Sequence, residues 1–140
     1  MKILLPVDGS EYTKRTLAYI AAHDELLPGS HEYIVVTAVA PIPAYAARFL
    51  QRSTIDDYYR DQAETVLEPV RAFAKMQGWK VREAVVHGSA DEAIAALART
   101  ERPDLVVMGS HGHSALGNMV LGSVATGVLA RCDVPVLLIR

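Results

Sequence analysis

The residues best suited to chemistry form a glycine-rich stretch, MGSHGHSALGNMVLGSV, at positions 108–124. The stretch holds four glycines and no lysine, arginine, aspartate or glutamate, and it follows an apolar run that is typical of a strand. Backbone N–H groups near Gly109, Gly112 and Gly122 could converge on one anion, and a helix starting after Gly122 would add partial positive charge. Ser123 would cap that helix or donate to a phosphate oxygen. Alternatively, the glycines only form turns and allow close helix packing. We favour phosphate binding.

This stretch does not match the better-known catalytic and metal-binding motifs. The spacing from Gly112 to Gly117 is that of a P-loop, but asparagine and methionine follow where lysine and serine or threonine belong. No histidine follows Ser114 to serve as the base of a nucleophile. His111 and His113 are more typical of exposed loop residues than of metal ligands. We therefore predict no catalytic residue and no protein metal ligand.

A second candidate group lies at the exit of the first expected strand, in the segment Pro6-Val-Asp8-Gly-Ser10. Asp8 or Ser10 would cap the helix that follows, or Asp8 would accept a hydrogen bond from a ligand amine. Val39 lies at the end of the second expected strand. Its side chain would form an apolar wall against the flat ring of a ligand or belong to the core.

Short apolar runs take turns along the chain with longer amphipathic segments, and this order predicts the elements that position these groups. Strands are expected over residues 3–7, 33–39, 81–87, 105–108 and 134–139, and helices over 11–27, 53–76, 90–100 and 124–131. Pro69 should kink or split the second helix, and Arg82 and Glu83 indicate an edge position for the third strand. This order predicts an α/β fold, a doubly wound five-stranded parallel sheet with helices on both faces. Ligands of such sheets bind where the strand order reverses, so the loops at 6–10 and 109–122 should be neighbours.

Composition narrows the class of protein. A chain of 140 residues with 14 basic and 16 acidic side chains predicts one globular domain, residues 1–140. Without a basic stripe, a nucleic-acid surface is not expected, and no apolar run approaches the roughly 20 residues of a membrane span. Cys132 is the only cysteine, and Pro6 and Asp8 interrupt the N-terminal apolar run, which is too short for a signal peptide. We expect a cytoplasmic protein that does not bind membranes.

These motifs together resemble the universal stress protein family. Gly109-x-x-Gly112, nine residues and then Gly122-Ser123 is similar to the nucleotide-binding signature of the family's ATP-binding subgroup. The segment Pro6-Val-Asp8-Gly-Ser10 resembles the opening motif of the family, and the similarity continues through residues 124–125 and 131–139.

The resemblance implies a Rossmann-like, adenine nucleotide alpha hydrolase-like sheet in a homodimer with an ATP site. Asp8 and Val39 would contact adenine, and Pro6 would lie near the ribose. The phosphates would be held by Gly109, Gly112, Gly122, Ser123 and Val124, with Met108 and His113 nearby. Many family members carry arginine where this chain has His113, so the charge at the phosphate end would depend on pH.

We expect an ATP-binding regulatory module of the stress response, whose nucleotide state alters its partners. Mg²⁺ would balance phosphate charge in a loop without lysine or arginine. A slow ATP hydrolase or self-phosphorylating enzyme is the first alternative, disfavoured because no base or arginine finger is evident. A dimeric scaffold with a vestigial pocket is the second. The homodimer would form through the last strand, Val134–Ile139, whose apolar edge needs covering.

Overall fold

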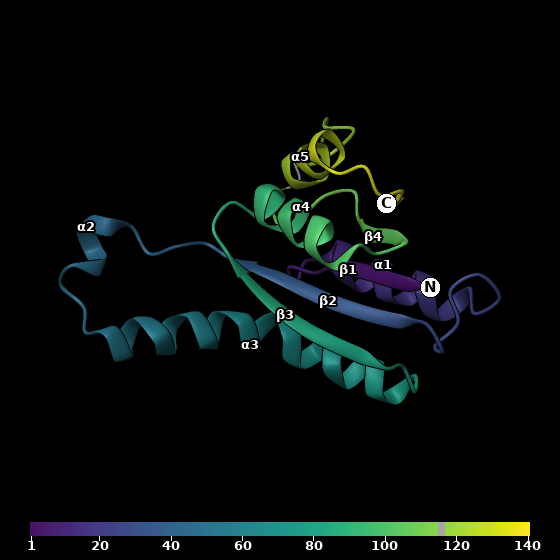
Figure 1. The fold of residues 1–140 in the computed structure, drawn as a ribbon, viewed down its shortest axis with the longest axis horizontal. Helices are drawn as coiled ribbons and strands as arrows, with labels where there is room; N and C mark the ends of the chain where they lie inside the picture. The colour runs from purple at the N-terminus through teal and green to yellow at the C-terminus, as the bar shows by residue number, and fades with distance from the viewer. Residues whose placement is uncertain (115–116) are drawn as a thin grey trace.

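A five-stranded parallel sheet forms the centre of the protein in the computed structural model, which describes residues 1–114 and 117–140 (Figure 1). Ala115 and Leu116 of the glycine-rich stretch therefore lie outside the described residues. The strands are β1 (Lys2–Pro6), β2 (Glu32–Val39), β3 (Val81–His87), β4 (Leu105–Gly109) and β5 (Val136–Ile139). Their order is β3-β2-β1-β4-β5, and every neighbouring pair is parallel. The predicted fold class is confirmed, and the strand order reverses between β1 and β4.

Helices cover both faces of the sheet. They are α1 (Glu11–Ala22), α2 (Ala44–Ala47), α3 (Arg52–Met76), α4 (Ala90–Glu101) and α5 (Ser123–Arg131). Because side chains alternate along a strand, Ile3 and Leu5 face a core shared with α1 and α3, whereas Leu4 faces a core shared with α4 and α5. Figure 1 shows these two layers, with α2 and the first part of α3 extending beyond the sheet.

Three helical segments can be compared with the prediction. Helix α1 ends at Ala22, five residues early, because His23 leaves helical geometry. One further turn, closed by the Leu27 N–H and the His23 carbonyl at 2.8 Å, still carries Leu27 into the core. Helix α3 is not split: it continues through Pro69, because the carbonyl left without a donor, that of Thr65, lies on the exposed side and can bond water. The short helix α2 lies where only a loop was expected.

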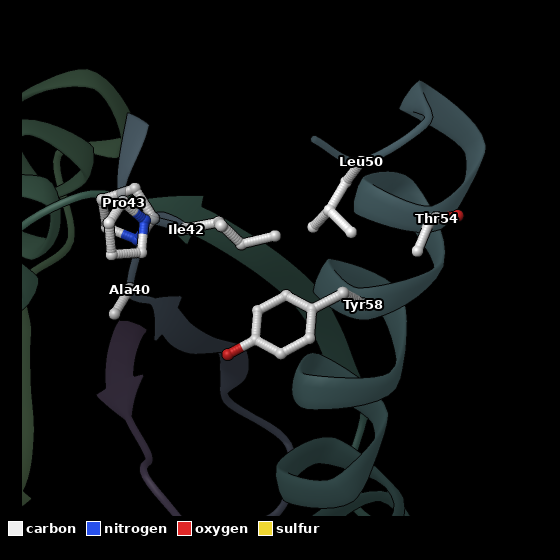
Figure 2. Close-up of a pocket in the computed structure, with 7 residues that line it drawn as sticks. Ala40, Ile42, Pro43, Leu50, Thr54 and Tyr58 are labelled. Atoms are coloured by element: carbon white, nitrogen blue, oxygen red, sulfur yellow. The ribbon is translucent and has the colours of Figure 1, made fainter. Parts of the chain in front are cut away.

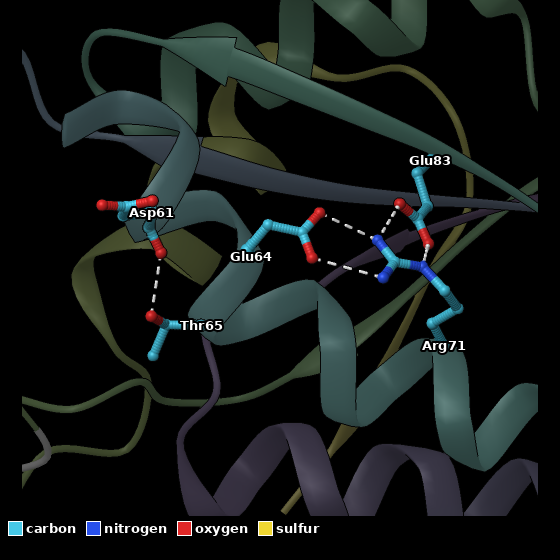
Figure 3. A network of polar contacts seen from close by, with 5 residues as sticks. All are labelled: Asp61, Glu64, Thr65, Arg71 and Glu83. Carbon is cyan, nitrogen blue, oxygen red and sulfur yellow. Dashed lines mark hydrogen bonds and ion pairs between the residues drawn. The ribbon is translucent and has the colours of Figure 1, made fainter. Parts of the chain in front are cut away.

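The predicted edge position of β3 is confirmed, and charged side chains of this strand form ion pairs with the neighbouring helices. Arg71 of α3 bonds Glu83 of β3 through Nε at 2.7 Å and Glu64 of its own helix through Nη2 at 3.0 Å (Figure 3). These bonds raise the pKa of Arg71 and lower the pKa of its partner Glu64. On the opposite face, Arg82 bonds Glu101 of α4 at 2.6 Å. The edge strand β5 begins at Val136, two residues later than expected.

Aromatic side chains fill the far end of the core under α3. Trp79, the only tryptophan, stacks on Tyr33 with 5.4 Å between ring centroids and meets Phe73 edge-on at 5.6 Å. Gly29 makes room for the indole, since a Cβ there would lie 2.8 Å from Cδ1 of Trp79. The Tyr33 hydroxyl donates to the Leu27 carbonyl at 2.9 Å, and burial, with the charge of Asp24, raises the pKa of Tyr33 to about 12.

In the part of the chain that the structure describes, no helix combines the length and apolar character needed to cross a bilayer.

Candidate functional site

A cavity of about 690 Å³ opens at the carboxyl edge of the sheet, next to the point where the strand order reverses. The loop after β1 and the loop after β4 both line it, so the predicted proximity of these loops is confirmed. The predicted residues found in the lining are Pro6, Asp8, Met108, Gly109, Gly112, His113, Gly122, Ser123 and Val124. The structure therefore gathers residues from both ends of the chain around one hollow.

Val39 is the predicted site residue that the structure does not bring to the cavity. Its side chain is 5% exposed and packs in the core shared with α1 and α3. Because neighbouring side chains of a strand point to opposite faces, Ala38 and Ala40 line the cavity instead. Ala90 and Ile94 of α4 complete this apolar end, which sequence reasoning missed because it did not follow the alternation along the second strand.

The glycines of the β4 loop serve close approach and not an unusual backbone path. None of Gly109, Gly112 and Gly122 has positive φ, whereas Gly9 has a φ of 76°. A Cβ at Gly109 would lie 2.6 Å from Cβ of Tyr12, and one at Gly122 would lie 3.0 Å from the His111 Cα. The loop therefore lies directly against α1 and folds back on itself.

Asp8 is held by its own loop through one carboxylate oxygen. The Ser10 N–H and the Thr13 hydroxyl donate to Oδ1 at 2.9 and 3.0 Å, and the Asp8 N–H donates to the Thr13 hydroxyl at 3.1 Å. Ser10 occupies the N-cap position of α1 without making a side-chain cap bond, so neither Asp8 nor Ser10 acts as the expected cap. Thr13 also lines the cavity. It was missed, although a hydroxyl in the first turn after Asp8 was the available signal.

Two histidines fasten the glycine-rich loop. His113 Nε2 lies 2.6 Å from the Asp8 carbonyl oxygen, and His111 Nε2 lies 2.8 Å from the Met119 carbonyl oxygen. A ring nitrogen that faces a carbonyl must carry hydrogen, so both Nε2 atoms are donors. His111 also contacts the Ser110 hydroxyl through Nδ1 at 2.9 Å. The two histidines therefore tie the loop to neighbouring backbone, His111 from a half-buried position and His113 from an exposed one.

The N-terminus of α5 lies at this cavity. Gly122 is the N-cap residue and makes no side-chain cap bond, while Ser123 is the first residue of the helix and does not cap it. The first N–H groups of a helix lack intrahelical partners and carry partial positive charge. Since Gly122, Ser123 and Val124 all line the cavity, this end can bind an anion.

A second hollow of about 320 Å³ lies between the loop after β2 and α3. Ile42, Leu50 and Tyr58 point toward one another across it (Figure 2). The Ile42 N–H donates to the Tyr59 hydroxyl at 3.1 Å, which ties the loop to α3. Ala40 borders both hollows, so the smaller one adjoins the apolar end of the main cavity.

Comparison with known proteins gives the family. The model of the universal stress protein family matches residues 1–140. A universal stress protein of Thermus aquaticus is 36% identical over 140 residues, which cover 99% of this chain and 97% of the relative. The chain belongs to the universal stress protein family.

Solved structures of universal stress proteins share the fold. The structure of MJ0577 from Methanocaldococcus jannaschii has a TM-score of 0.82 at 28% identity, covering 99% of this chain and 94% of that one. A universal stress protein in complex with cAMP has a TM-score of 0.71 at 22% identity, covering 100% and 97% of the two chains. One from Archaeoglobus fulgidus in complex with dAMP has a TM-score of 0.69 at 20% identity, covering 100% and 98%.

Proposed function

We propose that this universal stress protein binds an adenine nucleotide, namely ATP together with Mg²⁺, and acts as a regulatory binding module in the stress response. One observation carries the proposal. The cavity has an apolar end, at Ala38, Ala40 and Ile94, and an opposite end where the glycine loop meets the uncapped N-terminus of α5. A base would lie at the first end and phosphates at the second.

Size and family support this assignment. A volume of about 690 Å³ falls within the range of roughly 300–1,000 Å³ that small-molecule sites occupy. Two solved universal stress proteins are complexes with cAMP and dAMP, which are adenine nucleotides. In this chain, Pro6 and Asp8 would lie between the base and the phosphates, because β1 lies between β2 and β4.

Mg²⁺ is included because polyphosphate carries negative charge that has to be balanced. Among the described residues that line the cavity there is no lysine or arginine, so polyphosphate would be held by neutral dipoles alone. When bound, Mg²⁺ supplies the missing positive charge through the phosphate oxygens and retains most of its water ligands.

The alternative of an ATP hydrolase remains, but the lack of a fixed cation in the described lining favours binding without turnover. No lysine or arginine is found among the described residues that line the cavity. Phosphoryl transfer relies on positioned positive charge, such as an arginine finger, to stabilise its transition state. We therefore propose a binding module, with turnover below roughly one per second, the low end of the usual enzyme range.

We also propose a homodimer through the edge of β5, in the cytoplasm. The β3 edge carries Arg82 and Glu83, whereas β5 reads Val-Leu-Leu-Ile from residue 136 and carries no charge. Charged side chains discourage edge pairing, and an uncharged apolar edge is a template for it. A second copy of the chain covers that edge. A scaffold with a vestigial pocket would share this dimer and lack nucleotide.

Titration calorimetry tests the proposal, with ATP and GTP compared in the presence of Mg²⁺. The two ligands carry the same phosphates, so ATP should bind more tightly if the apolar end selects adenine. Mass spectrometry of small molecules released from gently purified protein should detect an adenine nucleotide. Absence of binding by any adenine nucleotide, with or without Mg²⁺, would favour the scaffold.

A further inference from the structure

We propose that α2 and the first part of α3 form a self-association surface that binds a second copy of the chain. Residues 40–61, called here the arm, carry both halves of the contact: the exposed side chain of Phe49 and the smaller hollow beside it. Phe49 of each copy enters the hollow of the other. This surface is distinct from the edge of β5, because α3 packs against β2 and β3 at the other edge of the sheet.

The arm exposes aromatic side chains that a monomer would normally bury. Phe49 is 84% exposed and Tyr45 is 70% exposed, and no residue of α2 is buried. Helix α2 and the first part of α3 extend beyond the sheet, so the core does not cover them (Figure 1). Exposed apolar patches of this kind mark protein–protein contacts, in which aromatic residues are common anchors.

Backbone hydrogen bonds hold Phe49 in place before any partner binds. The Phe49 N–H donates to the Ala46 carbonyl at 3.1 Å, which closes a turn directly after α2. The start of the same segment is tied to α3, because the Ile42 N–H donates to the Tyr59 hydroxyl at 3.1 Å. An anchor that is already ordered loses less conformational entropy when it binds.

The hollow beside Phe49 has room for an aromatic ring. Its volume of about 320 Å³ is at the low end of the range of roughly 300–1,000 Å³ that small-molecule sites occupy. Apolar groups of Ile42, Leu50 and Tyr58 point into it (Figure 2). Leu50 follows Phe49 in the chain, so the anchor and the hollow lie on one surface. A two-fold contact needs such a self-complementary surface, because the same residues serve both copies.

The face of α3 that borders the hollow is acidic. Thr54 and Tyr58 line the hollow, and Asp57 and Asp61 each follow one of them by three residues, which places all four on one face of the helix. Asp57 pairs with Arg60 at 3.0 Å. The Asp61 carboxylate pairs with no cation in the part of the chain that the structure describes (Figure 3).

A cation accompanies the anchor. Arg48 directly precedes Phe49, is exposed, and pairs with no acid among the described residues. When Phe49 of one copy enters the hollow of the other, Arg48 approaches Asp61 of that other copy, and the two-fold axis repeats the pair. A second copy therefore satisfies both charges, whereas an apolar small molecule in the hollow would leave both unpaired. This complementarity favours the second copy as the occupant.

The contact is small, so the association is weak. The substantially exposed apolar side chains of the arm are Tyr45, Phe49, Leu50 and Tyr58, and an aromatic side chain offers about 150–250 Å². At their exposed fractions these side chains supply roughly half of the 800 Å² that each partner buries in a standard interface. We expect association at about 0.1–1 mM protein, above the micromolar range in which the proposed contact through β5 forms.

Sedimentation equilibrium between about 10 µM and 1 mM protein tests the contact. The average mass of wild-type protein should rise above its low-concentration value, whether that value is a monomer or a dimer through β5. Phe49→Ala should weaken this association about tenfold or more, with an unchanged melting temperature because Phe49 is exposed. A rise in mass that Phe49→Ala shares would overturn the inference. A constant wild-type mass would also overturn it and would leave the arm to a different kind of partner.

Charge reversal tests the two-fold arrangement. Arg48→Asp alone should weaken association about tenfold or more, because acid then meets acid, and Asp61→Arg alone should do so because base meets base. An equimolar mixture of these two variants should associate to within about threefold of wild type, since each contact again joins opposite charges. Lys75→Asp, at the exposed far end of α3, is the matched control and should associate like wild type.

The charge variants can also refute the contact. Single reversals that associate like wild type, or a mixture that does not recover, would overturn the inference. None of these measurements involves a nucleotide, so their failure leaves the proposed function untouched.

Discussion

The imidazole Nε2 of His113 lies 2.6 Å from the carbonyl oxygen of Asp8, although 105 residues separate them in the chain. This contact joins the loop after β1 to the loop after β4 across the point where the strand order reverses. A single side chain thus connects the two loops that line the cavity, which leave the paired strands β1 and β4. Changes on either side of the contact should affect ligand binding more than folding.

Gly112→Val should weaken Mg²⁺-ATP binding tenfold or more while leaving the protein folded. A side chain at this position meets Oδ2 of Asp8, so the loops must separate. A tenfold loss corresponds to about 1.4 kcal/mol of binding free energy. Gly117→Val is the control, because a Cβ there has no atom within 4 Å among the described residues. Calorimetry and melting temperature check the pair; equal affinity in the two folded variants would contradict the expectation.

Leu138→Pro should convert the proposed dimer into a monomer. The Pro135 and Ile139 carbonyls accept bonds from the β4 side, so alternation directs the N–H of Leu138 to the free edge of the sheet. Proline there removes an outward donor and no bond to β4. Val85→Pro on the free edge of β3 is the matched control and should leave the dimer intact. Light scattering at micromolar concentration decides; a monomeric wild-type protein would refute the dimer.

Alkaline pH should destabilise the fold through Tyr33. Its pKa is raised from an ordinary value of 10 to about 12 in the folded protein, because burial favours the neutral phenol. The unfolded chain therefore loses this proton first, and the stabilisation, complete below pH 10, is lost as pH rises from 10 toward 12. Tyr33→Phe should cost about 1 kcal/mol at neutral pH and flatten this decline. Denaturant unfolding of both proteins across this range checks the slope; parallel profiles would contradict the assignment.

Gly127→Ala should lower the free energy of unfolding by about 1–3 kcal/mol. A Cβ at Gly127 of α5 would overlap the side chain of Asp91 in α4, whose carboxylate is held by Arg131 at 3.0 Å. The two helices that flank the cavity would have to separate. Thermal unfolding measures the cost, with Gly117→Ala as the control, because a Cβ there contacts none of the described residues. A neutral Gly127→Ala would mean that Asp91 moves aside freely.

Patterns that repeat along the chain predicted most of the fold. Short apolar runs identified all five strands, and the charges at Arg82 and Glu83 located the β3 edge, since a buried strand would not tolerate them. The end of α1 was missed because the next turn, through Leu27, keeps helical spacing after the helix has ended. Local patterns do not register a single non-helical residue such as His23.

The site was predictable where one loop supplies it and less so where distant elements meet. The glycine positions indicated the phosphate end, but not that Gly112 would face a carboxylate. Ala90 and Ile94 reach the cavity from α4, and nothing in their own segment distinguishes them from ordinary core residues. Only the crossover that lays α4 over the sheet brings them to Ala38.

The burial of Trp79 determines what tryptophan fluorescence can report about this protein. The indole lies among Tyr33 and Phe73 in the core shared with α1 and α3, whereas Ile94 and Met108 of the cavity belong to the core on the other face of the sheet. Its fluorescence should therefore follow unfolding, because Trp79 is buried in this core and does not itself line the cavity. Occupancy of the cavity therefore needs a separate probe, such as a nucleotide with a fluorescent ribose substituent. The two signals, recorded in one cuvette, would distinguish ligand release from loss of structure.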